Sequence, residues 1–231
     1  MKIIWLGHSG FRIEIENQVL LVDPWLTGNP AFPDERRAEA VAGATHILVS
    51  HGHGDHAANA LGLAKDLSIP IVCGHELSNV FNKDDGVAAI GFGKGGTVKL
   101  GKVAVTMVHA VHSSSVDFRD DAIQYAGGEA GFMIAGEGRT IYFSGDTDVM
   151  ADMAVFQDLH APDIGILCAG GHYTMDMKRA AYACTKFFDF SLVIPCHYKT
   201  FPILAQDADA LIAALPGGVV VEPEVLVPIR A

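Results

Sequence analysis

Residues 50–56 read SHGHGDH, so three histidines and one aspartate lie within six consecutive positions. Two imidazoles two residues apart, on a loop that leaves a strand, can point to one side and chelate a single metal ion. Because four ligands in so short a segment cannot all reach one ion, the spacing predicts two neighbouring ions, the first bound by His51 and His53 and the second by Asp55 and His56. The glycines between the ligands would let the backbone turn sharply without Cβ clashes. A histidine-rich surface turn without metal is the alternative, and it is weaker because the motif follows a buried strand.

This motif begins where a buried strand is expected to end. Residues 47–49 form a short apolar run before it, residues 57–67 have helical spacing after it, and residues 69–73 form a second apolar run. Further strands are predicted upstream and downstream, at residues 3–6, 11–15, 19–22, 98–100 and 103–108. The first half therefore reads as strands, then a helix, then a strand, with the motif on the loop that leaves one of the strands.

The second half of the sequence repeats this order. A predicted hairpin ends at Asp146, much as the first hairpin ends at Asp23, and residues 163–168 form a strand that runs into the glycine-rich segment GGHYTMD. The elements of this half are expected at residues 132–134, 140–143, 163–168, 177–188 and 192–195. We predict one α/β domain over residues 1–231, a four-layer αββα sandwich whose two β-then-α halves pack sheet to sheet.

Charge and composition limit the partners. The 231 residues include 27 acidic and 16 basic side chains, a formal net charge of −11. Since no Lys/Arg cluster interrupts that balance, we expect no nucleic-acid partner. An anionic small-molecule substrate stays compatible, because bound metal ions would reverse the local sign of the charge. Hydrophobic residues make up 50% of the chain, so either the core is extensive or a partner subunit covers part of the surface, and we expect a homo-oligomer.

The sequence also carries signals of cellular location. No apolar run approaches the ~20 residues that a membrane-spanning helix needs, so we expect no membrane partner. The first residues, MKIIWLGHSGF, reach polar side chains too early for a signal peptide, which predicts a cytoplasmic protein. The cysteines lie far apart without a CxxC pair and are expected to be reduced and buried: Cys73, Cys168, Cys184 and Cys196.

Residues 50–56 resemble the signature motif of the metallo-β-lactamase superfamily. Other motifs of that superfamily occur in its order: GHSGF near the start, LLVDPW, HSSS at 112–115, SGDT at 144–147 and CHY at 196–198. Together they resemble the small metal-dependent hydrolases related to ascorbate-6-phosphate lactonase, from Trp5 to about Pro202. The resemblance implies the same αββα fold that the order of elements predicts.

The resemblance also implies a full set of metal ligands. The seven residues fall into a first set, a second set and a bridge: His51, His53 and His112; Asp55, His56 and His197; and Asp146. Between His109 and His112, we choose His112 because the serines that follow it match the family motif. Two divalent ions are expected, most simply Zn²⁺, because a site of three neutral imidazoles suits zinc. The second site, richer in oxygen ligands, could equally hold Mn²⁺ or Fe²⁺.

Hydrolysis is the expected activity. A hydroxide bridging both ions would be the nucleophile, and Asp55 would orient it and accept its proton while the ions polarise the substrate. Asp146 stands where the common dizinc β-lactamases carry cysteine, which favours a small ester, lactone or phosphodiester as substrate. The alternative is a non-catalytic metal-binding or scaffold protein with the same fold. We favour the enzyme, because a structural site would fill its ligand shell without keeping a position open for water.

Several polar residues near these motifs have predicted roles outside the metal-ligand set. We predict that His172 and Tyr173, in GGHYTMD, line the pocket without binding metal, and that His172 donates a hydrogen bond or a proton to the substrate. Asp23 is either an acceptor for a metal-bound imidazole or a turn carboxylate. His8 either lies beside the metal or the substrate, or is a structural histidine. Residues 25–32 are expected to form a packed loop rather than a lid.

Overall fold

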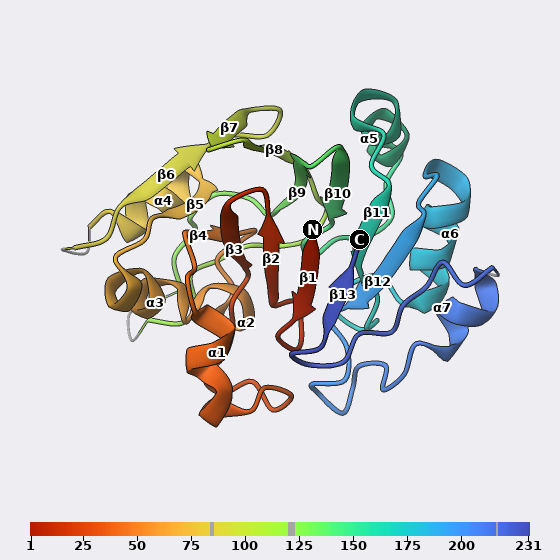
Figure 1. The fold of residues 1–231 in the computed structure, drawn as a ribbon, viewed down its shortest axis with the longest axis horizontal. Coiled ribbons are helices and arrows are strands. Elements are labelled where there is room, and N and C mark those ends of the chain that lie inside the picture. Colours follow the sequence, from red (N-terminus) through yellow and green to blue (C-terminus); the bar gives the residue numbers. More distant parts are fainter. Residues whose placement is uncertain (84–85, 120–122, 216) are drawn as a thin grey trace.

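Two β-sheets pack face to face, and helices cover their outer sides (Figure 1). The computed structural model describes residues 1–83, 86–119, 123–215 and 217–231. Helices from the first half of the chain flank one sheet, and helices from the second half flank the other (Figure 1). The molecule is therefore a four-layer α/β sandwich, as the order of elements predicted.

Within these residues, the first sheet contains seven strands: β1 (Lys2–Trp5), β2 (Phe11–Ile15), β3 (Gln18–Val22), β4 (His46–Val49), β5 (Ile71–Gly74), β6 (Ala89–Phe92) and β13 (Pro228–Arg230). Their order across the sheet is β13-β1-β2-β3-β4-β5-β6. The strands β1 to β3 are antiparallel, and β3 to β6 are parallel. Alternate residues of β2, namely Phe11, Ile13 and Ile15, are buried between the sheets, as a period of two requires.

The described part of the second sheet has six strands: β7 (Thr97–Leu100), β8 (Val103–His109), β9 (Ala130–Gly136), β10 (Arg139–Phe143), β11 (Ile164–Cys168) and β12 (Leu192–Cys196). They lie in the order β12-β11-β10-β9-β8-β7, with β10 to β12 parallel. Every residue of β11 is buried, because a parallel strand in this position is covered on both faces.

The helices connect strands along the outer faces. Those beside the first sheet are η1 (Asp34–Arg36), α1 (Arg37–Val41), α2 (Gly54–Ala57), α3 (Ala60–Leu67) and α4 (His75–Phe81). Those beside the second are α5 (Asp152–His160), α6 (Met177–Phe187) and α7 (Asp209–Ala214). The side chain of Asp176 accepts a hydrogen bond from the backbone N–H of Arg179 at 2.8 Å and so caps the start of α6.

The two halves follow the same path, as the sequence suggested. In each half a hairpin leads into a parallel strand, a loop, a helix and a further parallel strand, so β4 corresponds to β11 and β5 to β12. The loop after β4 carries SHGHGDH, and the loop after β11 carries GGHYTMD. The hairpin of β7 and β8, however, pairs with β9 and belongs to the second sheet.

One predicted helix is divided in two. Residues 57–67 were expected to be continuous, but α2 ends at Ala57 and α3 begins at Ala60. Between them, the side-chain oxygen of Asn59 accepts hydrogen bonds from the backbone N–H groups of Leu26 and Thr27, at 2.6 and 2.8 Å. The break lets a short helical turn carry Asp55 and His56 while residues 25–32 pack against it as an ordered loop, in agreement with the expected packed loop.

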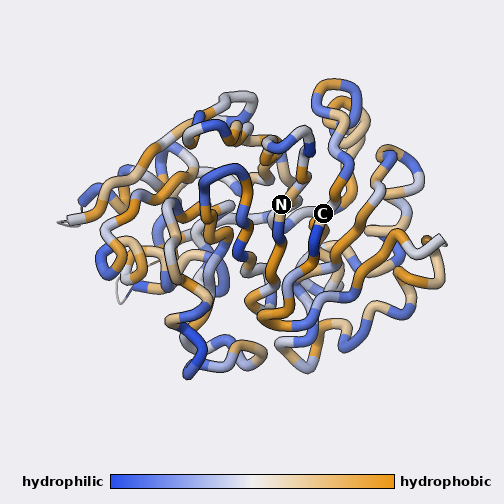
Figure 2. The backbone as a smooth tube through the Cα atoms, viewed as in Figure 1, coloured by the Kyte–Doolittle hydropathy of each residue, from blue (hydrophilic) through white to orange (hydrophobic). Residues whose placement is uncertain are grey.

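Apolar residues fill the sandwich and polar residues follow its loops (Figure 2). One core cluster lies between the sheets and under α6, and a second lies between the first sheet and its helices. The four cysteines are buried and free, as expected: Cys73, Cys168, Cys184 and Cys196. Among the described residues, no helix combines the length and the hydropathy that crossing a membrane would require.

Candidate metal centre

The predicted ligands come from the ends of strands in both sheets. His51 and His53 follow β4 of the first sheet, whereas His112, Asp146 and His197 follow β8, β10 and β12 of the second. Asp55 and His56 lie in the helical turn α2. These segments meet at one edge of the sandwich, so the candidate metal centre joins the two sheets.

The first cluster contains the three predicted imidazoles. Ring nitrogens of His51, His53 and His112 all lie within 4.8 Å of one another, and His51 Nε2 is 3.0 Å from His53 Nδ1. The other nitrogen of His51, Nδ1, is 3.0 Å from the hydroxyl of Ser50. That contact occupies Nδ1, so Nε2 is the atom that faces the cluster.

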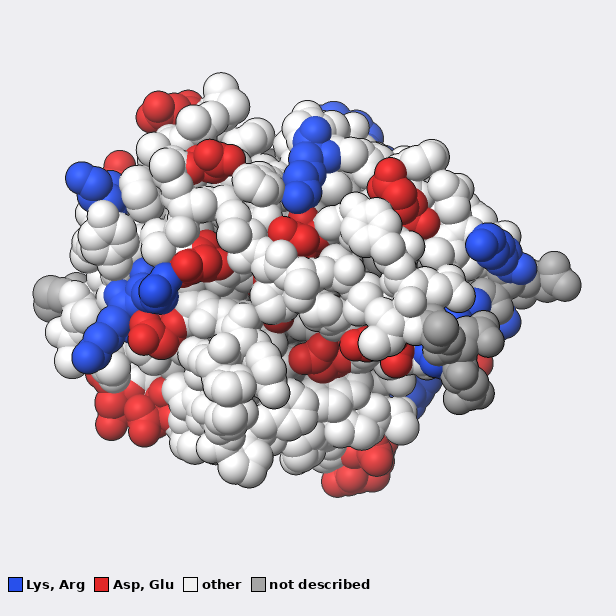
Figure 3. All heavy atoms as spheres, turned by 180° about the vertical axis from the view of Figure 1, so that it is seen from behind, with Lys and Arg blue, Asp and Glu red and all other residues white. Residues whose placement is uncertain are grey.

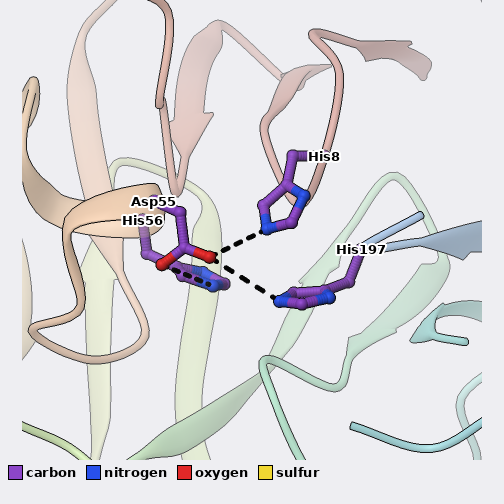
Figure 4. A group of neighbouring side chains, drawn as sticks. All are labelled: His8, Asp55, His56 and His197. Carbon is purple, nitrogen blue, oxygen red and sulfur yellow. Dashed lines mark hydrogen bonds and ion pairs between the residues drawn. The ribbon is translucent and has the colours of Figure 1, made fainter. Parts of the chain in front are cut away.

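The second cluster brings Asp55, His56 and His197 together and adds His8 (Figure 4). The carboxylate of Asp55 lies between the rings, with Oδ1 3.8 Å from His56 Nε2 and Oδ2 3.8 Å from His197 Nε2. Its Oδ2 is also 3.0 Å from His8 Nε2. One carboxylate and three imidazoles from distant segments therefore converge on one point.

Asp146 lies between the two clusters. Its Oδ2 is 3.0 Å from Nε2 of His197 and 3.4 Å from Nε2 of His56, both in the second cluster. The same oxygen is 3.6 Å from Nε2 of His112 in the first cluster. Asp146 is buried, so this carboxylate faces imidazoles from both sides rather than solvent.

Asp23 orients one of these imidazoles. Its Oδ2 is 2.8 Å from Nδ1 of His56 and also accepts the hydroxyl of Ser50 at 2.6 Å, while Oδ1 accepts the N–H of Ser50 at 2.7 Å. Of the two interpretations left open by the sequence, the geometry is that of an acceptor for a site imidazole. Such carboxylate–histidine pairs commonly fix the tautomer of a metal-binding histidine.

Charges in the centre fit divalent cations. Burial opposes the ionisation of Asp146, but the facing His197 and His56 hold its pKa well below the usual range. Burial and the nearby His56 keep the pKa of His51 well below its ordinary value, so this imidazole is neutral. Metal binding needs ionised carboxylates and neutral imidazoles, the states that Asp146 and His51 have here.

His56 shows the attraction of this site for positive charge. Burial alone would lower the pKa of His56, but Asp146, Asp55 and Asp23 raise it well above its ordinary value. The carboxylates that hold a proton there would equally attract a metal ion. Moreover, His56 Nε2 and Asp146 Oδ1 are buried without a hydrogen-bond partner in the described structure, which is the arrangement expected of ligand atoms.

A cavity of about 350 Å³ opens onto the centre. It is lined by residues of both clusters and by flanking side chains: His53, Asp55, His112, Ser113, Asp117, Asp146, Tyr173, His197 and Phe201. Tyr173 thus lines the cavity as expected. His172 instead lines a neighbouring hollow that shares Tyr173, and its ring contacts Tyr173 with centroids 4.4 Å apart.

His109 lies away from the centre. Its side chain is 45% exposed, and Nδ1 is 2.9 Å from Oδ2 of Asp152 on α5. This placement agrees with the choice of His112, whose ring is 5.5 Å from that of His51.

The glycines of the motif serve a different purpose from the predicted one. Neither Gly52 nor Gly54 has a left-handed backbone. A Cβ at Gly52 would instead lie 2.7 Å from the carbonyl oxygen of Ser115, and one at Gly54 would lie 3.2 Å from the carboxylate of Asp117. The glycines therefore permit the loop after His112 to approach the motif closely.

Left-handed backbone occurs instead at non-glycine residues in and beside the two clusters. His8, Asp23 and His197 have φ values of 54°, 44° and 57°. Such conformations are uncommon for residues with a Cβ and persist where surrounding contacts enforce them. Residue spacing contains no signal of this strain. The GHSGF motif marks the segment of His8 but does not decide between a place beside the metal or the substrate and a structural role, and the fold places His8 in the second cluster.

Comparisons with known proteins show the family of this chain. The family model described as Beta-lactamase superfamily domain matches residues 18–198. A protein of Dinoroseobacter shibae named UPF0173 metal-dependent hydrolase is 65% identical over 98% of both chains, and one of Paracoccus denitrificans with the same name is 62% identical over 99% of both.

Solved structures have the same fold. Igni18, described as a novel metallo hydrolase from Ignicoccus hospitalis, has a TM-score of 0.81 and 30% identity, covering 100% of this chain and 98% of its own. An isothiocyanate hydrolase from Delia radicum gut bacteria has a TM-score of 0.78 at 15% identity, covering 100% of this chain and 99% of its own, and a likeness at that identity shows the fold alone. The fold and the clustered site define a metal-dependent hydrolase. The chain belongs to the metallo-β-lactamase superfamily.

Proposed function

We propose that this protein hydrolyses a small ester, lactone or phosphodiester with two divalent metal ions bound side by side. The main support is the position of Asp146, whose Oδ2 lies within 3.6 Å of imidazole nitrogens from both clusters. One carboxylate placed between two sets of ligands is suited to bridge two ions. The proposed ligands are His51, His53 and His112 at the first ion, Asp55, His56 and His197 at the second, and Asp146 between them.

The donor atoms favour particular metals. Three imidazole nitrogens suit Zn²⁺ at the first position, and the carboxylates at the second position suit Zn²⁺, Mn²⁺ or Fe²⁺. When bound, ions of this kind act as Lewis acids and lower the pKa of water to about 7. The protein supplies a buried, ordered frame for them through Asp23 and Ser50, which fix His56 and His51.

Other residues of the cavity would bind and orient the substrate. Asp55 lines the cavity and is placed to accept a proton there, and Tyr173 and Phe201 offer aromatic surface to the part of the substrate that does not react. None of the described residues lining the cavity is Lys or Arg. A negative charge on the part of the substrate inside this cavity would therefore be met by the ions. Basic side chains elsewhere, as on the face shown in Figure 3, are interspersed with Asp and Glu.

Three further expectations belong to this proposal. His172 would reach the substrate from the neighbouring hollow, with the substrate extending past Tyr173. Residues 1–231 would act as one cytoplasmic domain. The protein would form a homo-oligomer, which light scattering after size-exclusion chromatography measures directly.

The test combines metal analysis with an activity panel. Protein reconstituted with Zn²⁺ should contain about two ions per chain by elemental analysis, and it should hydrolyse at least one class in a panel of chromogenic esters, lactones and phosphodiesters. No more than one ion per chain would contradict the dinuclear proposal. Two ions without turnover on the whole panel would favour a metal-binding protein instead.

A further inference from the structure

His8 is placed in the second cluster by the fold rather than by any ligand spacing. It follows β1 and is fully buried, with 0% of the residue exposed. Its Nε2 is 3.0 Å from Oδ2 of Asp55, and its Nδ1 is 2.6 Å from the hydroxyl of Thr200. The ring thus links Asp55, a proposed metal ligand (Figure 4), to a residue of the loop after β12.

Hydrogen-bond chemistry fixes the direction of these contacts. An ionised carboxylate can only accept, so the hydrogen between His8 and Asp55 belongs to Nε2 of His8. Nδ1 of the neutral ring is then an acceptor, and the hydroxyl of Thr200 donates to it. The two hydrogen bonds, from Thr200 to His8 and from His8 to Asp55, therefore each pair one donor with one acceptor.

The backbone of His8 is held as firmly as its ring. Its carbonyl oxygen accepts hydrogen bonds from the indole N–H of Trp5 at 2.8 Å and from the backbone N–H of His197 at 3.0 Å. The rings of Trp25 and Phe201 pack edge-on against it, with centroids 5.3 and 5.5 Å away. These contacts over-determine a left-handed backbone that would otherwise be unfavourable.

We propose that His8 is a positioning residue of the second metal site, which acts by donating its Nε2–H to Oδ2 of Asp55. This hydrogen bond fixes the rotation of the carboxylate so that Oδ1 lies toward His56, at 3.8 Å from Nε2. The inference rests on the proposed dinuclear function. The competing role is that His8 binds the second ion through Nε2, in which case its contact with Asp55 is one between two ligands.

Two amide substitutions of His8 separate these roles. The amide nitrogen of His8→Gln can occupy the place of Nε2 and still donate to Asp55, whereas the shorter His8→Asn cannot reach it. Asn also tolerates the left-handed backbone of position 8. His8→Asn, the variant without the donor to Asp55, is therefore also the variant better suited to fold. Thr200→Val leaves position 8 intact and removes the donor to Nδ1. His46→Asn, a half-buried histidine outside the centre, is the matched control.

The measurements are Zn²⁺ affinity by competition with a chromophoric chelator, metal content, and the visible spectrum of the Co²⁺-substituted protein. We expect His8→Asn to lower the affinity for the second ion by about 10–100-fold, as loss of a hydrogen-bond partner of a metal ligand typically does. His8→Gln should keep the wild-type affinity and cobalt spectrum, His46→Asn should match the wild type, and Thr200→Val should weaken the second ion by about tenfold.

The outcomes distinguish the inference from the function on which it rests. Wild-type protein that binds fewer than two ions overturns both. If the wild type binds two ions, a His8→Asn variant of unchanged affinity overturns the positioning role alone. Equal losses in His8→Asn and His8→Gln, with altered cobalt spectra in both, would instead make His8 a metal ligand.

Discussion

The carboxylate of Asp23 lies 2.8 Å from Nδ1 of His56, and both side chains are completely buried. This contact turns Nε2 of His56 toward Asp146. A pair of the same chemistry joins His109 and Asp152 at 2.9 Å, but there both side chains are about half exposed. The two pairs therefore allow a comparison between an imidazole–carboxylate contact inside the candidate metal centre and one on the surface.

Asp23→Asn should lower the affinity for the second ion by about 10–100-fold, because the neutral amide no longer orients His56 as a carboxylate does. Asp152→Asn is the matched control and should leave the affinity for both ions unchanged. Stepwise Zn²⁺ titration against a chelator measures both variants. Wild-type affinity in Asp23→Asn would show that the carboxylate is only a turn residue.

His112→Ala should remove most of the affinity for the first ion, since it deletes one of three imidazoles. His109→Ala should leave the metal content unchanged, because its partner Asp152 is outside the centre. Elemental analysis of both variants at equal metal loading decides the assignment. Loss of metal from the His109 variant, with retention in the His112 variant, would reverse it.

Asp146→Ala should abolish hydrolysis and weaken the second ion more than the first, because its Oδ2 is nearer to His197 and His56 than to His112. Asp148→Ala, two residues further on and paired with Arg179 at the surface, controls for changes in that loop. The measurements are metal content and turnover on the substrate class found active. Equal weakening of both ions would contradict the asymmetry.

Gly52→Ala should destabilise the fold by about 1–3 kcal/mol, because the added Cβ would meet the carbonyl oxygen of Ser115. Gly62→Ala is the control in α3, where no atom lies within 4 Å of the added Cβ, and it should stabilise the helix by up to about 1 kcal/mol. Urea unfolding of the two variants gives the comparison. A Gly52→Ala variant as stable as the wild type would mean that the loop at Ser115 can move away from the added Cβ without a loss of stability.

His172→Ala should keep both ions and the fold but lose roughly a hundredfold in turnover, the lower range for a general acid. Its place in the hollow beside Tyr173 requires the substrate to extend past that ring. A metal assay, a melting curve and a rate on one preparation separate this role from packing. Full activity with normal metal content would remove His172 from the site.

Much of the fold was predictable because its strands have strong local patterns. The alternation in Phe11 to Ile15 and the continuous apolar run of β11 identify a half-buried and a fully buried strand. The short helices α1, α4, α5 and α7 and the edge strands β6 and β13 were not predicted, since elements this short contain too few apolar positions for a period to stand out in the sequence. Register and pairing, such as β7 and β8 joining the second sheet, depend on tertiary contacts that local pattern does not encode.

For the site, spacing identified residues that are close in the chain, and resemblance supplied those that are distant. Spacing alone assigns His51 and His53 to one ion and Asp55 and His56 to another. Nothing in the spacing indicates that His197 joins Asp55 and His56. The roles of Asp23 and His8 depend on atoms brought together by the fold, at separations of 33 and 47 residues from His56 and Asp55. The sequence motifs could identify the segments of Asp23 and His8, but they could not identify the residues that these side chains contact.

The contact between His8 and Thr200, 192 positions apart, has a consequence for the order of assembly. The first cluster is complete once a growing chain includes His112, whereas the second waits for His197 and the loop after β12. Contacts of such long sequence separation form late, because loop closure must precede them. Occupancy of the second ion would then report that both ends of the chain have met, and its early loss on heating would mark the separation of His8, after β1, from the loop after β12.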